Sequence, residues 1–289
     1  MRKSHKFRNK TIPLLVTVSP VTIWLILLVA APLVYVFFLS FLSTDGYNVV
    51  FQFTLKNYMD LFNPIYLEIY SNSFLLAFLT TVVCILLGYP FAYSMARAAK
   101  KKKAVMMIML MIPFWTNSLI RLNGWKTILG KTGLLNSLLL NIGILHQPVE
   151  ILYTRGAVIL GMVYILFPYM VLPLFASIDK LDQSLLEASN DLGANKVKTF
   201  LHVTLPLTSP GVFSGTILVF IPALGYFFVS DIMGGAKSQL IGNLIENQFK
   251  AANNWPLGAA LSMLLIVIII IMVTIYKKCG GDMKDLGVL

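Results

Sequence analysis

The sequence has few charged residues and almost no cysteine. Only 12% of its 289 residues are Asp, Glu, Lys or Arg, whereas 57% are hydrophobic, and a soluble domain would carry about one quarter charged residues. Its two cysteines, Cys84 and Cys279, are too few for a disulfide framework or a metal site. These shortages argue against a soluble enzyme and indicate a chain that lies mostly in lipid.

Ionisable residues are nearly absent from the long apolar runs, where only Arg121 and Asp231 occur, both at outer ends. A charge at mid-membrane costs about 3 kcal/mol and is retained mainly for function. Without buried carboxylates or histidines the runs offer no proton relay, which argues against a proton-coupled carrier and leaves the energy supply to another subunit. No HExxH motif occurs either. We therefore expect no catalytic residue, no cofactor and no metal in this chain.

Six apolar runs are long enough to cross a bilayer, whose hydrocarbon core of about 30 Å needs roughly 20 helical residues. They lie near 18–42, 72–95, 104–122, 156–178, 212–232 and 257–276. The first run follows a basic stretch, as a signal peptide would, but it stays apolar too long and lacks a convincing cleavage site. The sequence therefore predicts an all-α polytopic membrane protein with six transmembrane helices.

A seventh apolar segment, 127–145, is interrupted by Gly130, Lys131 and Gly133. Its uninterrupted remainder, 134–145, is too short to span a bilayer. We expect it to form an interfacial or a re-entrant helix, with Trp125 at the level of the lipid headgroups, where amphipathic rings prefer to lie.

Basic residues gather on one side of this predicted topology. Most of the 23 Lys and Arg residues fall in the two terminal tails, in the loop after the second run and in the loop after the fourth, so this side is expected to be cytoplasmic. The net charge of +11 is then a topology signal and not a sign of nucleic-acid binding. The predicted parts are a basic tail 1–17, a first transmembrane helix 18–42, a periplasmic loop 43–71, a five-helix core 72–278 with a cytoplasmic loop 179–211, and a tail 279–289.

The cytoplasmic segment 187–211 is typical of two short helices separated by Gly193, a residue that suits a left-handed helix stop. The second helix is expected to be amphipathic and to end near Pro206. Ser184 and Glu187 form an S-x-x-E capping box, so Glu187 also has a purely structural interpretation, as part of a helix start. A helix-turn-helix on the basic face of a protein without its own energy source is nevertheless suited to docking a partner.

This segment resembles the EAA loop of ABC importer permeases, in which E-A-A is followed by G and then by L-P. The matching positions are Glu187, Ala188, Ser189, Gly193, Leu205 and Pro206, with Ser189 in place of the second alanine. The resemblance implies a type I ABC importer permease fold. It also implies that the loop forms the coupling helix, which sits in a groove of a cytoplasmic ATPase.

The resemblance extends along nearly the whole chain. The stretches FTLKNYMDLFNP, LLGYPFAYSMAR, IPFWTNSLIR and PALGYFFVSDIMGGAKSQLIGNLIENQF are similar to the first permease of spermidine/putrescine importers. This implies ATP-driven import of polyamines across a bacterial inner membrane, with both termini cytoplasmic. It implies as partners a second permease in a heterodimer, two copies of an ATPase and a periplasmic polyamine-binding protein. An ABC permease for another small solute, an ion-coupled secondary carrier and a purely structural membrane scaffold are the alternatives.

Polyamines are flexible polycations, so a pathway for them should offer carboxylates and aromatic faces. The candidates for this pathway are Asp231, at the outer end of the fifth run, with Tyr226 and Trp115 as aromatic companions. Each has a structural alternative, because an interfacial aspartate can cap a helix and aromatic residues can belong to the belt at the membrane surface.

Overall fold

The computed structural model describes residues 18–46, 48–235 and 238–278. The predicted basic tail 1–17, the predicted tail 279–289 and Cys279 lie outside the described residues. The chain divides into two compact units, one of 1–63 with 245–266 and the other of 64–244 with 267–289.

The first unit begins with a membrane-length helix, Val18–Leu39, which ends in α2 (Ala31–Leu39). An antiparallel hairpin of β1 (Leu42–Asp45) and β2 (Asn48–Phe53) follows, pairing Ser43 with Val50 and Thr44 with Val49, and then α3 (Lys56–Asp60). The Asn57 side chain donates hydrogen bonds to the carbonyls of Ser40 (2.9 Å) and Leu42 (2.8 Å). These bonds fasten α3 to the point where the first span ends.

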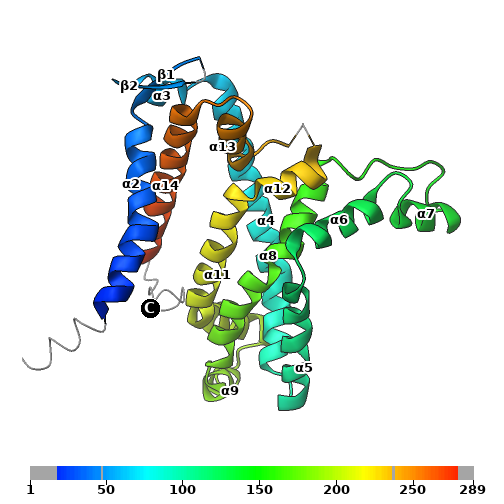
Figure 1. The fold of residues 1–289 in the computed structure, drawn as a ribbon. Coiled ribbons are helices and arrows are strands. Elements are labelled where there is room, and N and C mark those ends of the chain that lie inside the picture. Colours follow the sequence, from blue (N-terminus) through cyan, green and yellow to red (C-terminus); the bar gives the residue numbers. More distant parts are fainter. Residues whose placement is uncertain (1–17, 47, 236–237, 279–289) are drawn as a thin grey trace, which may run out of the picture. The chain divides into compact units, whose positions relative to one another are not determined.

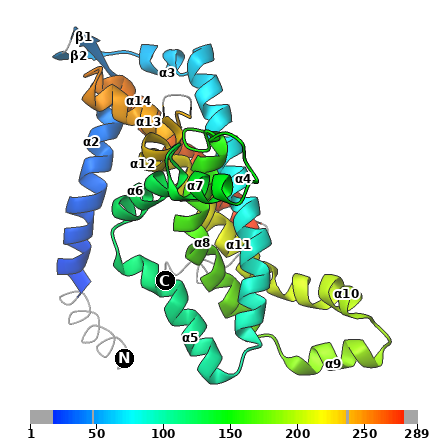
Figure 2. The same ribbon diagram turned by 90° about the vertical axis from the view of Figure 1, so that its right-hand side faces the viewer.

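The second unit is a helical bundle built on α4 (Pro64–Ala96), α8 (Arg155–Asp179) and α11 (Leu205–Gly225), which pack against one another (Figure 2). Its other elements include α5 (Lys100–Met111), α6 (Ser118–Leu129), α7 (Leu134–Asn141), α9 (Gln183–Asp191), α10 (Lys196–Thr199) and α12 (Phe227–Val229). Helices α13 (Ile241–Lys250) and α14 (Trp255–Lys278) each have residues in both units.

Close packing holds the three central helices together. Helix α8 buries a row of large side chains at every fourth position, namely Met162, Leu166, Met170, Leu174 and Ile178. Gly215 of α11 faces this row, and a methyl group added there would lie 2.6 Å from the Met170 sulfur. Small residues of this kind let helix backbones approach in lipid, where no hydrophobic force drives helices together.

Membrane-length helices account for five of the six predicted spans. In the part of the chain that the structure describes they are Val18–Leu39, Pro64–Ala96, Arg155–Asp179, Lys196–Gly225 and Trp255–Lys278. The bent pair Lys100–Trp115 and Ser118–Asn141 brings the number to six if it forms one span. The all-α membrane fold predicted from the sequence is confirmed, with the hairpin β1–β2 as a small addition.

The predicted third span, 104–122, is wrong beyond Trp115. A 3₁₀ turn that contains Pro113 ends the first helix, and the following helix leaves at an angle of 93° (Figure 1). Thr116 is extended, and the Asn117 side chain caps α6 by accepting a hydrogen bond from the Leu119 N–H at 2.8 Å. Residues 118–122 therefore begin α6 instead of continuing the span.

The second helix predicted within segment 187–211 does not end near Pro206, which corrects the prediction. It is continuous from Lys196 to Gly225 and becomes the fifth span. A proline inside a helix removes one hydrogen bond and crowds the carbonyl four residues earlier. The π-helical turn Phe200–Thr204, directly before Pro206, widens the helix at that place.

The outer end of the predicted fifth span, 212–232, is also wrong. The helix stops at Gly225, and Tyr226 (φ −76°, ψ 63°) turns the chain into α12 (Figure 1). Gly242 of α13 lies so close to this helix end that a methyl group added there would meet the Gly225 carbonyl oxygen at 2.6 Å. Asp231 consequently lies beyond the span, in the π-helical turn Ser230–Gly234.

Candidate functional site

The turn between α9 and α10 has the geometry of a Schellman motif. Gly193 has φ +80°, its N–H donates to the Asn190 carbonyl (2.9 Å), and the Ala194 N–H donates to the Ser189 carbonyl (3.1 Å). The next helix starts at Asn195, whose side chain accepts a hydrogen bond from the Lys198 N–H at 2.9 Å. The predicted left-handed stop at Gly193 is confirmed.

The start of α9 differs from the prediction. The N-cap is Asp182, whose carboxylate accepts a hydrogen bond from the Ser184 N–H at 3.0 Å. This bond lowers the pKa of Asp182 below its ordinary value. The predicted capping box of Ser184 and Glu187 is wrong because Ser184 already lies inside the helix. Glu187 is exposed and has no hydrogen-bond or ion-pair partner among the described residues, so its side chain is open to a partner protein.

The helix pair turns two small polar side chains inward and several apolar side chains outward. Ser189 and Thr199 are buried, and their hydroxyls lie 3.0 Å apart. The exposed apolar residues are Leu185, Leu192, Val197 and Leu201, of which Leu192 is 89% exposed. Ala188 and Pro206 are exposed and Leu205 is half-buried. An apolar surface of this kind, with Glu187 beside it, is typical of a protein contact.

Two polar contacts brace the base of this loop against the preceding loop. The Arg97 guanidinium donates to the Gln183 side-chain oxygen at 3.1 Å, and the Lys103 ammonium lies 2.5 Å from the Asp179 carboxylate. Both loops lie at the same end of the unit (Figure 2). Sequence reasoning used Arg97 and Lys103 only as topology signals and missed these contacts.

A cavity of about 370 Å³ lies at the other end of α5, where the chain bends. It is lined by Phe114, Trp115, Thr116, Asn117, Ser118, Arg121, Ile165, Tyr169 and Tyr226. The fold thus brings together Trp115 and Tyr226, the two aromatic residues predicted for the substrate path. Trp115 is 83% exposed, so most of its ring surface is available for contact.

Arg121 is a cavity residue that the sequence indicated only as a charge at a span end. Its guanidinium carbon lies 5.9 Å from the centre of the Phe114 ring and 5.4 Å from that of the Tyr164 ring. Its Nε and Nη1 are buried without a hydrogen-bond partner among the described residues. Cation–π contact with these two rings therefore substitutes for hydrogen bonds.

Asp231 does not line this cavity, although the prediction grouped it with the two aromatic residues. It is exposed, and its carboxylate accepts a hydrogen bond from the Asn243 amide at 2.6 Å. The same amide donates to the Phe227 carbonyl (3.2 Å), and its oxygen accepts from the Leu240 N–H (2.9 Å). Asn243, which sequence reasoning missed, thus orders the turn that presents Asp231.

The fold defines a class, a polytopic membrane permease, and this chain exposes a helix pair, α9 and α10, between two of its spans. The chain belongs to the family of binding-protein-dependent transport system inner membrane components, whose family model matches residues 61–279. It is accordingly a transport subunit and not itself an enzyme.

Similar proteins agree with this family. The spermidine/putrescine transport system permease protein PotB of Haemophilus influenzae is 45% identical over 92% of this chain and 93% of its own. PotB of Escherichia coli is 46% identical over 89% of this chain and 94% of its own. A solved bacterial alginate ABC transporter, in complex with an alginate pentasaccharide-bound periplasmic protein, has a similar fold. It has a TM-score of 0.77 at 17% identity, and the match covers 93% of this chain and 94% of that one.

Proposed function

We propose that the chain is the permease subunit of an ATP-driven importer that carries polyamines, spermidine or putrescine, across a bacterial inner membrane by alternating access. The observation that carries the proposal is identity of 45% or more, over nine tenths of their length, to permeases named for these substrates. The scarcity of ionisable residues in the spans supports an energy source outside the chain and disfavours an ion-coupled carrier.

The importer would contain a second permease as heterodimer partner, two copies of a cytoplasmic ATPase and a periplasmic polyamine-binding protein. The loop from α9 to the start of α11 is the proposed ATPase contact, through Glu187, Ala188, Ser189, Gly193, Leu205 and Pro206. Of these, Glu187, Ala188, Gly193 and Pro206 are exposed, Leu205 is half-buried, and the buried Ser189 acts by holding the turn. Its apolar side chains and the open carboxylate of Glu187 support this role, because a protein contact combines apolar packing area with polar groups that pair across the interface.

The aromatic cavity is the proposed entry to the substrate path. Trp115 and Tyr226 offer ring faces to an ammonium group. Arg121 occupies the faces of Phe114 and Tyr164 and brings a positive charge, which repels a polycation unless carboxylates compensate it. We assign part of that compensation to Asp231 and the rest to the second permease.

The proposal is tested by transport in liposomes that contain the purified permease pair and ATPase, with the binding protein outside and ATP inside. Labelled spermidine should accumulate only with both ATP and binding protein, and unlabelled putrescine or spermidine should compete, whereas a neutral sugar should not. Dissipating ion gradients with ionophores should leave the rate unchanged. Uptake that ignores ATP and collapses with the gradients would establish a secondary carrier, and uptake of another solute alone would refute the polyamine assignment.

A further inference from the structure

The chain after the bend carries an apolar ridge that the described residues of the second unit leave largely exposed. Leu134, Leu138 and Ile142 are 62%, 48% and 70% exposed. They follow one another at intervals of four residues, so they lie along one face of α7 and its last turn.

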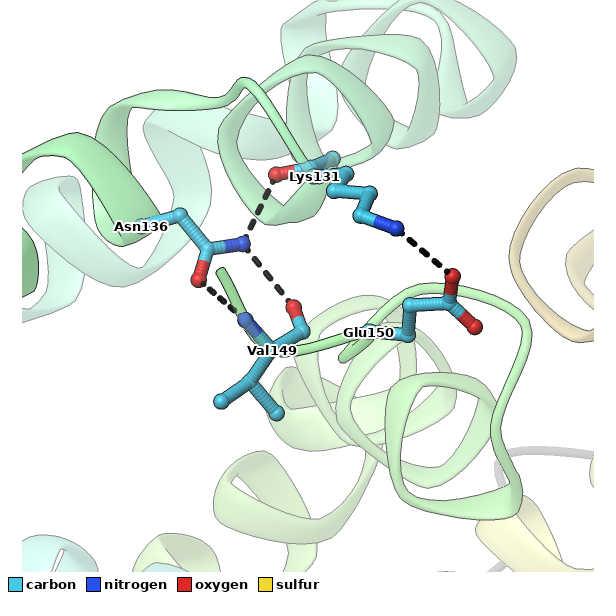
Figure 3. Close-up of polar contacts among 5 residues, drawn as sticks. Lys131, Asn136, Val149 and Glu150 are labelled. Carbon is cyan, nitrogen blue, oxygen red and sulfur yellow. Dashed lines mark hydrogen bonds and ion pairs between the residues drawn. The ribbon is translucent and has the colours of Figure 1, made fainter. Parts of the chain in front are cut away.

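The opposite face of α7 is fixed by polar contacts (Figure 3). The Asn136 amide donates to the carbonyls of Gly130 (3.1 Å) and Val149 (2.9 Å), and its oxygen accepts from the Val149 N–H (3.0 Å). Asn136 is 1% exposed. Two helical residues span a rotation of about 200°, so Leu134 and Leu138 point away from the return segment 143–154, which Asn136 holds at Val149.

The direction of the ridge follows from the place of this return segment. Both Figure 1 and Figure 2 show the segment between α7 and α8 on the side of α7 that faces away from α5. The ridge therefore faces the side on which α5 runs. Because α5 enters the membrane and the arm α6–α7 leaves at 93° to it, the arm lies parallel to the bilayer with its apolar ridge turned toward the lipid.

We propose that the ridge Leu134, Leu138 and Ile142 is inserted into the outer leaflet, at the boundary of headgroups and acyl chains. Lipid is favoured over a periplasmic protein because a protein that approaches from the periplasm meets the return segment and not the ridge. This inference concerns the position of the arm and is independent of the transported substrate.

Helix α6, which joins the bend to α7, is packed against α8. Insertion of α7 into the leaflet would therefore also fix the position of the bend. Leu122 and Leu129 of α6 are 0% and 2% exposed, and the Trp125 ring meets the Tyr164 ring of α8 edge to face at 5.6 Å. A methyl group at Gly161 would lie 3.2 Å from Leu122, so α6 and α8 are in close contact. An arm anchored in the leaflet therefore holds the bend, and the cavity beside Trp115, at a fixed depth.

Two single-cysteine variants of the full transporter test the proposal in liposomes. Leu138→Cys and Gln147→Cys, both at exposed positions, would carry an environment-sensitive fluorophore in a Cys279→Ser background, where the remaining thiol of Cys84 is fully buried. The quenchers are a phospholipid with a nitroxide near its headgroup and iodide in the outer buffer. Ile142→Cys serves as a second ridge position.

The labels on Leu138→Cys and Ile142→Cys should be quenched by the nitroxide lipid several times more strongly than by iodide, and the label on Gln147→Cys should show the reverse order. Equal quenching by iodide at all three positions would overturn the proposal. So would shielding of the ridge only after the periplasmic binding protein is added, because the ridge would then be a protein contact.

Discussion

The hydroxyl groups of Ser189 and Thr199 lie 3.0 Å apart inside the turn between α9 and α10, and both residues are buried. Ser189 stands where the EAA pattern has its second alanine. The Ser189 hydroxyl forms a hydrogen bond with Thr199 that an alanine at this position could not form. This bond joins the two helices of the proposed coupling loop. A buried hydroxyl left without a partner costs about 1–3 kcal/mol.

A double-mutant cycle should detect this bond. Ser189→Ala and Thr199→Val should each destabilise the purified permease by about 1 kcal/mol, and the double variant should cost less than the sum of the two. Thermal unfolding of the four proteins in detergent measures the coupling. Strict additivity would mean that the two hydroxyls contribute independently and that the bond does not hold the turn.

Gly193→Val should uncouple ATP hydrolysis from uptake. Gly193 has φ +80° with open space around it, so the substitution acts through backbone strain of about 1–2 kcal/mol or more and not through a clash. The matched control is Gly143→Val, at φ +79° and equally open, in the arm after α7. ATPase activity and spermidine uptake are measured at equal protein level in liposomes.

Uptake per ATP should fall in Gly193→Val and stay near the wild-type ratio in Gly143→Val. If both variants keep the wild-type ratio, the α9–α10 turn is not the coupling element.

The sequence predicted what depends on local chemistry. Span-length apolar runs and the left-handed stop at Gly193 follow from the residues themselves. The bend after Trp115 was missed because contacts between helices, such as that of Leu122 with α8 at Gly161, decide where α6 goes. Pro206 was interpreted as a helix end, but a π-helical turn accommodates it.

The site shows the same division between local and distant contacts. Trp115, Tyr226 and Asp231 were predicted from the chemistry of their side chains. Whether they line the same cavity depends on the fold, which brings Trp115 and Tyr226 together and does not place Asp231 in the cavity wall. Arg121 and Asn243 were missed because their partners, Tyr164 and Asp231, lie on other helical elements, which only the fold brings next to them.

Reporter fusions should establish the orientation on which the coupling argument depends. Fusions after Lys102 and Asn195 should report a cytoplasmic location, and one after Asn141 a periplasmic location, because the loops of the first two sites and the two terminal tails together hold most of the basic residues. Paired alkaline phosphatase and fluorescent protein fusions measure this. A periplasmic signal at Asn195 would remove α9 from reach of a cytoplasmic ATPase.

Replacing Trp115 should weaken transport through loss of its ring. Trp115→Leu should lower polyamine uptake by about 2- to 30-fold, the range that corresponds to a cation–π contact of about 0.5–2 kcal/mol. Trp115→Phe keeps an aromatic face and should retain more of the activity. Initial rates in proteoliposomes distinguish them. Equal rates in the Leu and Phe variants would show that bulk, and not the aromatic face, matters at this position.

Asp231→Asn tests whether the carboxylate presented by Asn243 attracts the cationic substrate. The change keeps the side-chain size and an oxygen that can accept from Asn243, but it removes the charge. Uptake should fall by about tenfold, equivalent to about 1.4 kcal/mol, while assembly with the ATPase and binding protein stays intact. Asp231→Glu should keep part of the activity. The control Glu68→Gln removes an exposed carboxylate near the N-terminus of α4 and should have no effect.

Salt provides a readout that a purely structural role of Asp231 would not change. The range of electrostatic attraction shrinks from about 10 Å at 0.1 M salt to about 3 Å at 1 M. Uptake by the wild type should therefore decrease more steeply with salt than uptake by Asp231→Asn. Asn243→Ala should weaken uptake as well, because it removes the amide that holds both the carboxylate and the Phe227 carbonyl. If Asp231→Asn transports normally and follows the wild-type salt curve, Asp231 only shapes the turn after α12, and the charge that balances Arg121 must come from the second permease.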